Sequence, residues 1–162
     1  MRASWERDAT HAKLKNTIYD CQITRALTLN KLCILGGSSP FTVSLINELL
    51  TQKTIPHNLV MHGRNSRSLT LVMQYAQQVL STVGWQVTAS TNMDEALHNA
   101  NIVLHQIRYG GMQGRADDEI FSAKMAVPAD ETLGPAALRR ALFLIQPLRQ
   151  VCEKINSFCP EA

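Results

Sequence analysis

Short apolar runs alternate with helical segments from residue 31 onward, and this alternation limits the possible folds more than any other feature of the chain. The predicted strands are residues 31–35, 58–62, 85–89 and 101–108. Between them, apolar residues recur every three or four positions, as on one face of a helix. Strands joined through helices need crossover connections, which are nearly always right-handed. The sequence therefore predicts an α/β fold, a Rossmann-like doubly wound parallel sheet between two layers of helices.

The predicted helices lie between and after these strands. They cover residues 42–50, 66–83, 93–100 and 135–158. In the last helix, Pro147 is expected to kink the helix or to split it in two. The buried stripe of that helix is expected to contain Leu138, Leu142, Ile145, Leu148, Cys152 and Ile155. Because a loop follows this helix where a parallel unit would add a strand, the three-layer sheet is expected to be incomplete at its C-terminal side.

The first 30 residues differ from the rest of the chain. They contain no glycine or proline, and their apolar residues keep no sustained period. We expect residues 1–30 to form a weakly structured N-terminal extension. Residues 31–162 are long enough to bury a core of their own, so we expect them to form one Rossmann-like domain.

Charge and composition exclude several classes of function. The chain has 16 Lys and Arg against 13 Asp and Glu, and its basic residues form no cluster that would bind nucleic acid. No apolar run approaches the roughly 18 residues of a membrane span, and no secretory signal is recognisable. The four cysteines form no CxxC pair, so reduced thiols fit best. We therefore expect a cytoplasmic protein that binds neither nucleic acid nor membrane.

A glycine turn, Gly36-Gly37-Ser38-Ser39, joins the first strand to the first helix. Backbone N–H groups in such a turn, together with the helix dipole, can hold a pyrophosphate. In the dinucleotide fingerprint G-x-G-x-x-G, Gly36 keeps the first position, while Ser38 and Phe41 replace the other two glycines. Similar turns occur in α/β proteins without a nucleotide, so this turn alone leaves nucleotide binding open.

The end of the second strand bears on which dinucleotide would bind. A fold that binds NAD usually carries Asp or Glu there, because a carboxylate bonds the ribose hydroxyls. This chain has His62-Gly63-Arg64-Asn65 instead. Arg64 is a candidate partner for the 2′-phosphate of NADP; the alternative is a solvated arginine in a surface turn. The choice between NAD and NADP stays open.

Three segments carry more specific patterns. Residues 107–119 read IRYGGMQGRADDE, residues 129–137 read ADETLGPAA, and residues 35–42 read LGGSSPFT. In this order they resemble the I-R-V-G-x-x-x-x-R-x-x-D-E, G-Q-E-T-x-G-P-G-G and I-G-G-G-S-x-x-T segments of glycoside hydrolase family 4. That family includes 6-phospho-α- and β-glucosidases, α-galactosidases and α-glucuronidases. The resemblance covers residues 31–162 and implies that they form an NAD(P)-binding domain.

The resemblance also implies an unusual way to hydrolyse a glycoside. Enzymes of this family use NAD and a divalent metal, typically manganese, in place of the usual pair of carboxylates. Oxidation at C3 of the sugar acidifies the proton at C2, a tyrosine removes that proton, and the aglycone leaves. Water then adds at C1 and the hydride returns. The implied substrate is a sugar or a sugar phosphate.

By the same resemblance, individual residues acquire expected roles. The expected cofactor-binding residues of the turn are Gly36, Gly37, Ser38, Ser39 and Thr42. Arg115 matches an arginine that contacts the substrate, where a guanidinium can grip a hydroxyl or a phosphate; the alternative is an ion pair with Asp118 or Glu119. Glu131 matches a glutamate that tunes the catalytic tyrosine; the alternative is a carboxylate stabilised by a helix dipole.

The chain also departs from the family pattern. Ser38, Val43, Ala136 and Ala137 replace family glycines or a proline. The family's metal-binding cysteine and histidine and its tyrosine base would follow residue 162, so we expect no metal ligands and no turnover from this chain alone. One hypothesis is a truncated N-terminal domain of a longer glycosidase-like protein. The other is a degenerate module that binds NAD(P), or nothing, and acts by association. Apolar surface left uncovered would favour a homo-oligomer.

Overall fold

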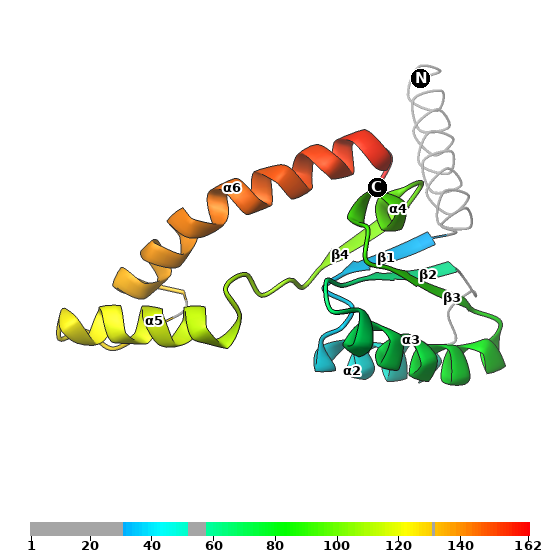
Figure 1. Ribbon diagram of the computed structural model, residues 1–162, viewed down its shortest axis with the longest axis horizontal. Coiled ribbons are helices and arrows are strands. Elements are labelled where there is room, and N and C mark those ends of the chain that lie inside the picture. The colour runs from blue at the N-terminus through cyan, green and yellow to red at the C-terminus, as the bar shows by residue number, and fades with distance from the viewer. Residues whose placement is uncertain (1–30, 52–57, 131) are drawn as a thin grey trace, which may run out of the picture.

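A four-stranded parallel sheet forms the centre of the computed structural model, which describes residues 31–51, 58–130 and 132–162. The strand order is β3-β2-β1-β4 (Figure 1). The strands are β1 (Lys31–Leu35), β2 (Asn58–His62), β3 (Gln86–Ser90) and β4 (Ile102–His105). Leu35 pairs with His62 on one side and with His105 on the other, so β1, β2 and β4 end at the same level. The predicted parallel sheet is confirmed.

Helices cover both faces of this sheet (Figure 1). The helices are α2 (Pro40–Thr51), α3 (Ser66–Leu80), α4 (Met93–Leu97), α5 (Gly111–Lys124) and α6 (Gly134–Phe158), with a 3₁₀ turn, η1 (Ser81–Val83), after α3. Helices α2 and α3 pack on one face, while α4 and the C-terminal part of α6 pack on the other. The winding reverses between β1 and β4, which is where α/β folds of this kind bind ligands. The predicted three-layer, doubly wound fold is confirmed.

Alternate strand residues point to opposite faces and build two hydrophobic clusters. The cluster under α2 and α3 contains Ile34, Ile46, Leu59, Met61, Leu69, Ala76, Leu80, Trp85 and Val87. The cluster under α4 and α6 contains Cys33, Leu35, Val60, Ala96, Leu97, Ala100, Val151 and Cys159. Because the last three residues of β1 are fully buried, the glycine turn that follows them starts from a rigid support.

Helix α5 was not predicted from the sequence. It begins after Gly110, whose φ of +79° suits glycine. Its buried residues are Gly114, Asp118 and Ser122, which lie one turn apart on a single face. Since none of these three has a large apolar side chain, hydrophobic periodicity could not reveal the helix.

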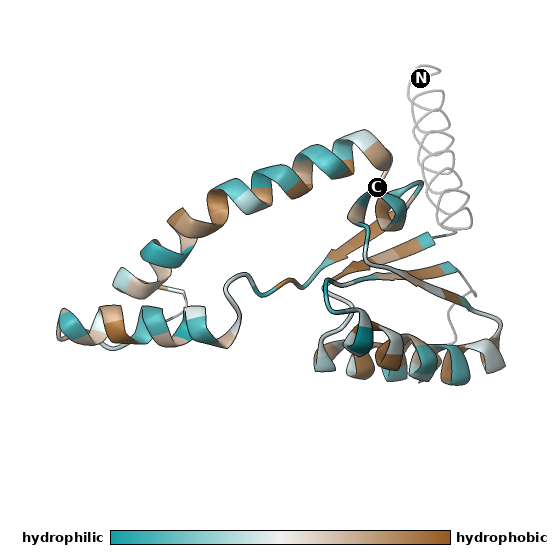
Figure 2. Cartoon of the chain, in the orientation of Figure 1, coloured by the Kyte–Doolittle hydropathy of each residue, from teal (hydrophilic) through white to brown (hydrophobic). Residues whose placement is uncertain are grey.

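Helix α6 differs from its prediction in two respects. It runs through Pro147 as one helix, so the predicted split is not found. The predicted buried stripe is wrong, because Leu138 and Leu142 are each 63% exposed and Ile145 is 60% exposed. The helix contacts α5 near its start and the sheet side near its end, where Val151 is buried. The part between these contacts extends beyond the sheet, and hydrophobic residues lie along it (Figure 2).

Strand β4 has one edge without a neighbour. Among the described residues it pairs only with β1. Its residues Ile102 and Leu104 are 46% and 38% exposed. The expectation that the sheet is incomplete on the side of β4 agrees with this open edge.

Two further expectations concern the whole chain. In the described ranges, no helix is both long and apolar enough to span a membrane. The predicted extension, residues 1–30, lies outside the described residues, so the domain boundary at residue 31 stays a prediction.

Candidate functional site

The glycine turn is fastened to the end of the neighbouring strand β2. The N–H groups of Gly36 and Gly37 both donate to the carbonyl of His62, at 3.0 and 2.7 Å. Gly36 has a φ of +92°, and a Cβ on Gly37 would lie 2.7 Å from the Cβ of Met61. The two glycines therefore serve the geometry of the turn, and their amides are already occupied.

Ser38 and Ser39 face a cavity of about 410 Å³ at the carboxyl ends of β1, β2 and β4. The N–H of Ser39 donates to the carbonyl of Gly36 at 3.0 Å, and its hydroxyl accepts from the N–H of Phe41 at 3.3 Å. The N–H of Ser38 has no hydrogen-bond partner among the described residues. That amide and the two hydroxyls are the groups of the turn that remain for a ligand.

Thr42 lies behind the turn, outside the residues that line this cavity. Its side chain is fully buried, and its hydroxyl accepts from Nε2 of Gln106 at 2.5 Å. The same Nε2 donates to the carbonyl of Gly36 at 3.4 Å, and the N–H of Gln106 donates to the carbonyl of Leu35 at 2.9 Å. Gln106, which the sequence analysis did not single out, thus ties the end of β4 to the glycine turn.

Arg64 lies in the same cavity as the two serines. Its side chain is exposed and has no ion pair with any described residue. The basic side chains Arg108 and Lys154 also line this cavity, whereas no Asp or Glu does. The cavity is therefore suited to an anion.

A second cavity, of about 760 Å³, adjoins the first. The two share Ser39 and the four residues 106–109 that follow β4. Arg115 lines only the larger one, where its Nε lies 2.9 Å from Oε1 of Glu119 and both side chains are about half exposed. The structure thus places the predicted substrate residue in a different cavity from Ser38 and Arg64, while Ser39 lines both cavities. The ion pair with Glu119, one of the two expected alternatives, is formed.

A cluster of charged groups holds α5 against α6. The carboxylate of Asp118, whose side chain is 11% exposed, accepts from Arg139 and from Nε of Arg140, the latter at 2.6 Å. Arg140 also donates to the carbonyls of Tyr109 and Gly114. A Cβ on Gly114 would lie 2.7 Å from Nη2 of Arg140, so a larger residue there would displace the guanidinium from these contacts. These contacts fix the position of the helix that carries Arg115.

Glu131 lies outside the described residues, and its predicted role is untested. The preceding residue, Asp130, lines the larger cavity. Its carboxylate accepts from the hydroxyl and the N–H of Thr132, both at 2.6 Å, and from the N–H of Leu133 at 3.3 Å. These bonds, first that from the Thr132 hydroxyl, lower the pKa of Asp130. The carboxylate therefore closes a turn at the start of α6 and stays ionised.

The family resemblance implies a dinucleotide and a manganese ion, and the described residues fit the first but not the second. A free amide, two hydroxyls and an acid-free basic lining suit the pyrophosphate of a dinucleotide. For manganese, in the part of the chain that the structure describes, no three His, Cys, Asp or Glu side chains lie close enough to share an ion. The expectation that this chain supplies no metal ligands stays a prediction for the whole chain.

Comparison with known proteins finds a family model and several relatives that match this chain. Residues 31–162 match the family model described as family 4 glycosyl hydrolase. A Bacillus subtilis protein named probable 6-phospho-beta-glucosidase is 28% identical over 138 residues, 82% of this chain and 31% of that protein. The phospho-alpha-glucosidase PagL of Clostridium acetobutylicum is 27% identical over 139 residues, 80% of this chain and 30% of that protein.

Solved structures share the fold. A 6-phospho-alpha-glucosidase from gut microorganisms, in complex with NAD and Mn2+, has a TM-score of 0.74 at 20% identity and covers 82% of this chain and 32% of its own. The Thermotoga maritima 6-phospho-beta glucosidase with manganese, NAD+ and glucose-6-phosphate has a TM-score of 0.72 at 20% identity, over 79% of this chain and 31% of its own. This chain thus spans about a third of the length of the proteins it matches.

Proposed function

The chain belongs to the family 4 glycosyl hydrolases, and on that premise we propose that residues 31–162 are the NAD(P)-binding domain of a protein that hydrolyses O-glycosidic bonds in sugar phosphates. The observation that carries this proposal is the basic, acid-free cavity at the point where the sheet reverses its winding. Two of the relatives are named as phosphoglucosidases, which supports the substrate class.

The smaller cavity would hold the dinucleotide. The free N–H of Ser38 and the hydroxyls of Ser38 and Ser39 would bind the pyrophosphate, and the glycines would bring the backbone close to it. Thr42 would act through Gln106 by keeping the turn in place. When bound, the nicotinamide ring supplies a hydride acceptor.

The larger cavity would hold the sugar phosphate. Arg115 lines it beside Glu119, which holds the guanidinium in one orientation. The guanidinium of Arg115 would bind a phosphate or hydroxyl of the substrate. Glu131, which lies outside the described residues, would tune the tyrosine base, as the family resemblance implies. No step is assigned to a metal ion, since no three His, Cys, Asp or Glu side chains of the described residues lie close enough to share one.

Location and association complete the proposal. We place the protein in the cytoplasm, in keeping with the free thiols of Cys33, Cys152 and Cys159. The exposed apolar side chains of α6 and the open edge of β4 favour association of two or more copies, or cover by further chain of a longer protein.

A second candidate function has its own support. The amides of Gly36 and Gly37 are occupied by the His62 carbonyl, and no carboxylate stands at the end of β2. These features favour a degenerate module that binds a dinucleotide weakly, or not at all, and acts by association. The two candidates differ in whether a dinucleotide binds, and a titration decides between them.

The decisive variant adds a negative charge to the cavity without damage to the fold. We expect NAD and NADP to bind the wild-type chain in a calorimetric titration. Ser39→Asp should weaken both, because the new carboxylate repels phosphates, yet Asp is a favoured residue before a helix and keeps the bond to the Phe41 N–H. Ser66→Asp, at the exposed start of α3 and outside both cavities, is the matched control and should bind normally.

Each result has a definite meaning. No binding to a wild-type chain that circular dichroism shows to be folded would overturn the proposal and favour the association module. Equal weakening by Ser39→Asp and Ser66→Asp would mean that the dinucleotide binds outside this cavity. If the dinucleotide binds as expected, a longer form of the protein should release nitrophenol from nitrophenyl 6-phosphoglycosides when NAD and manganese are present.

A further inference from the structure

The ring of His62 has an unusual position in the smaller cavity. It is the last residue of β2, it lines the cavity, and it is only 5% exposed. Its Nδ1 is buried and has no hydrogen-bond partner among the described residues. Buried polar atoms in folded proteins are nearly always bonded, so an exception beside a cavity points to a partner that the described residues do not supply, such as a ligand in that cavity.

A hydroxyl is the partner that suits this atom best. Burial lowers the pKa of His62. A hydrogen bond with the backbone of Thr91 opposes this shift, and the positive charge of Arg64 adds to it. The ring is therefore neutral near neutral pH, and Nδ1 either donates or accepts according to the tautomer. A hydroxyl can accept or donate in turn, and so it satisfies Nδ1 in both cases.

Arg64 supplies a charge next to this ring. It is exposed, it lines the same cavity, and it has no ion pair with a described residue. Of the other basic groups there, Lys154 already pairs with Asp94. A guanidinium without a carboxylate, at the rim of an acid-free cavity, suits a phosphate ester.

The position of these two residues relates them to the dinucleotide. The carbonyl of His62 accepts from both glycines of the turn, and a Cβ on Gly63 would lie 3.0 Å from the hydroxyl of Ser38. The pyrophosphate turn and the end of β2 are therefore in direct contact. In folds of this class, the end of the second strand meets the adenosine ribose, where a carboxylate suits NAD and an arginine suits NADP.

We propose that the smaller cavity selects NADP over NAD, with Nδ1 of His62 bound to a ribose hydroxyl and Arg64 bound to the 2′-phosphate. This inference rests on the proposed function, because it presumes that a dinucleotide occupies the cavity. It adds the identity of that dinucleotide, the residue that distinguishes NADP from NAD, Arg64, and a contact from His62 to the ribose of either dinucleotide.

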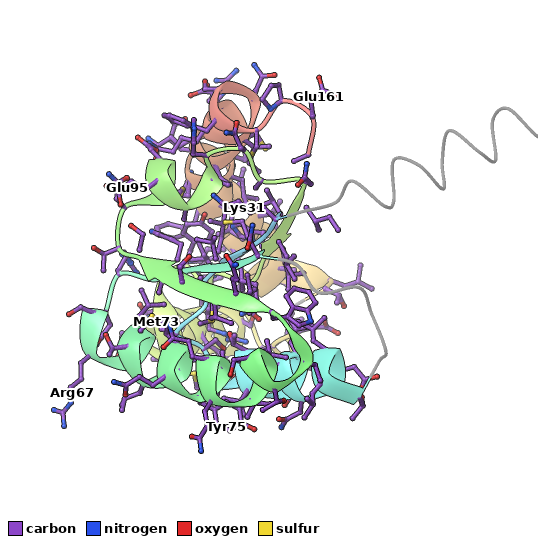
Figure 3. All side chains as sticks on the ribbon, turned by 90° about the vertical axis from the view of Figure 1, so that its right-hand side faces the viewer. Lys31, Arg67, Met73, Tyr75, Glu95 and Glu161 are labelled. Carbon is purple, nitrogen blue, oxygen red and sulfur yellow. The ribbon has the colours of Figure 1, made fainter. Side chains whose placement is uncertain are left out.

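Charge reversal at Arg64 tests the selection. By calorimetric titration we expect the wild-type chain to bind NADP about 10- to 100-fold more tightly than NAD, as for a bond between charged groups. Arg64→Glu should remove this preference, because the new carboxylate repels the 2′-phosphate of NADP and can accept from the ribose hydroxyls of NAD. Arg67→Glu makes the same charge change on α3, where the side chain points away from the molecule (Figure 3), and should keep the preference.

Substitution of the ring tests the second contact. His62→Phe keeps a planar ring but removes the unpartnered nitrogen. We expect it to weaken NAD and NADP by a similar factor, about 5- to 10-fold, while the thermal midpoint of the free chain stays the same or rises. A residue with only a structural role would instead lower that midpoint and leave the affinity of the folded chain unchanged.

The outcomes separate this inference from the proposed function. Tighter or equal binding of NAD by the wild-type chain would overturn the selection of NADP and leave the dinucleotide site intact. An equal effect of Arg64→Glu and Arg67→Glu would show that net charge, and not Arg64, governs affinity, which also overturns the inference. Failure of both dinucleotides to bind the folded chain would overturn the proposed function and this inference together.

Discussion

Asn in place of Asp118 should loosen α5 from α6 and leave the sheet intact. The carboxylate of Asp118 is the point where Arg139 and Arg140 from α6 meet α5. An asparagine of nearly the same volume keeps one oxygen acceptor but loses the negative charge and turns an N–H₂ group toward the two guanidiniums. The substitution thus tests charge with little change in packing.

The expected cost follows from the exposure of the partners. Removal of one member of a fully buried ion pair costs about 3–5 kcal/mol, whereas a pair on the surface contributes about 0–1 kcal/mol. Asp118 is 11% exposed, Arg140 is 23% exposed and Arg139 is 43% exposed. The energy of the Arg140 bond should therefore be close to that of a buried ion pair, and the energy of the Arg139 bond close to that of a surface pair. We expect a loss of about 2–3 kcal/mol in the stability of the α5–α6 contact.

Hydrogen exchange measures this loss where it occurs. A loss of about 2–3 kcal/mol corresponds to roughly 30- to 150-fold faster exchange of the protected amides in α5, Gly111–Lys124, if α5 opens locally. Amides of β1, which lies in both hydrophobic clusters, should exchange at the wild-type rate. Mass spectrometry of peptic fragments resolves the two regions.

Asp117→Asn is the matched control. It makes the same change one residue earlier, where the carboxylate accepts an exposed bond from Gln113 at 2.9 Å and no other bond from the described residues. We expect less than about 0.5 kcal/mol from that change. Equal exchange in the two variants would refute the assignment of the cluster as the contact that holds α5. Faster exchange in β1 as well would refute the view that α5 and α6 open separately from the sheet.

Three other perturbations test the packing around the site. Gly36→Ala and Gly134→Ala both place an alanine at a positive φ, +92° and +88°, which costs about 1–2 kcal/mol of stability in each variant. Only at Gly36 would the new Cβ also meet backbone atoms, those of Gln106 at 3.0 Å. Urea denaturation should therefore show a larger loss for Gly36→Ala, and equal losses would contradict the close approach. Thr42→Val removes the shorter of the two hydrogen bonds of the part-buried Gln106 amide and should lower the free energy of unfolding by about 1–3 kcal/mol in the same assay. Burial raises the pKa of Cys33 from 9.0 to about 12. The free energy of unfolding should therefore fall as the pH rises through that interval, because the unfolded chain loses this proton first. Iodoacetamide at pH 8 should label exposed Cys152 but not Cys33 in the folded chain.

The strands were predictable because their burial is continuous and their ends carry turn residues. Each apolar run of the sequence became a strand within a few residues, and Gly84 closes the segment after α3 with a φ of +88°, where a glycine is favoured. The signals that specify these elements are local. Periodicity and turn chemistry therefore sufficed to derive the architecture.

The parts that escaped prediction depend on contacts between distant residues. Gln106 is held by Thr42, 64 residues earlier in the chain, and no local pattern indicates that bond. Helix α5 is held by the ionic contacts of Asp118 in place of an apolar stripe. The middle of α6 was predicted to be buried because it carries an apolar stripe. Such a stripe indicates that a helix can pack against another surface, but it does not show that the described residues provide that surface.

The same contacts connect the two cavities. The residues 106–109 line both of them. At one end of this segment, Gln106 is bonded to the glycine turn, and at the other end the carbonyl of Tyr109 accepts from Arg140 at 3.3 Å. The segment is thus fixed from the sheet on one side and from α6 on the other. A variant that opens the α5–α6 contact should therefore disturb Arg115 and the larger cavity first. The dinucleotide cavity, which is supported by the buried end of β1 through Gln106, should keep its geometry.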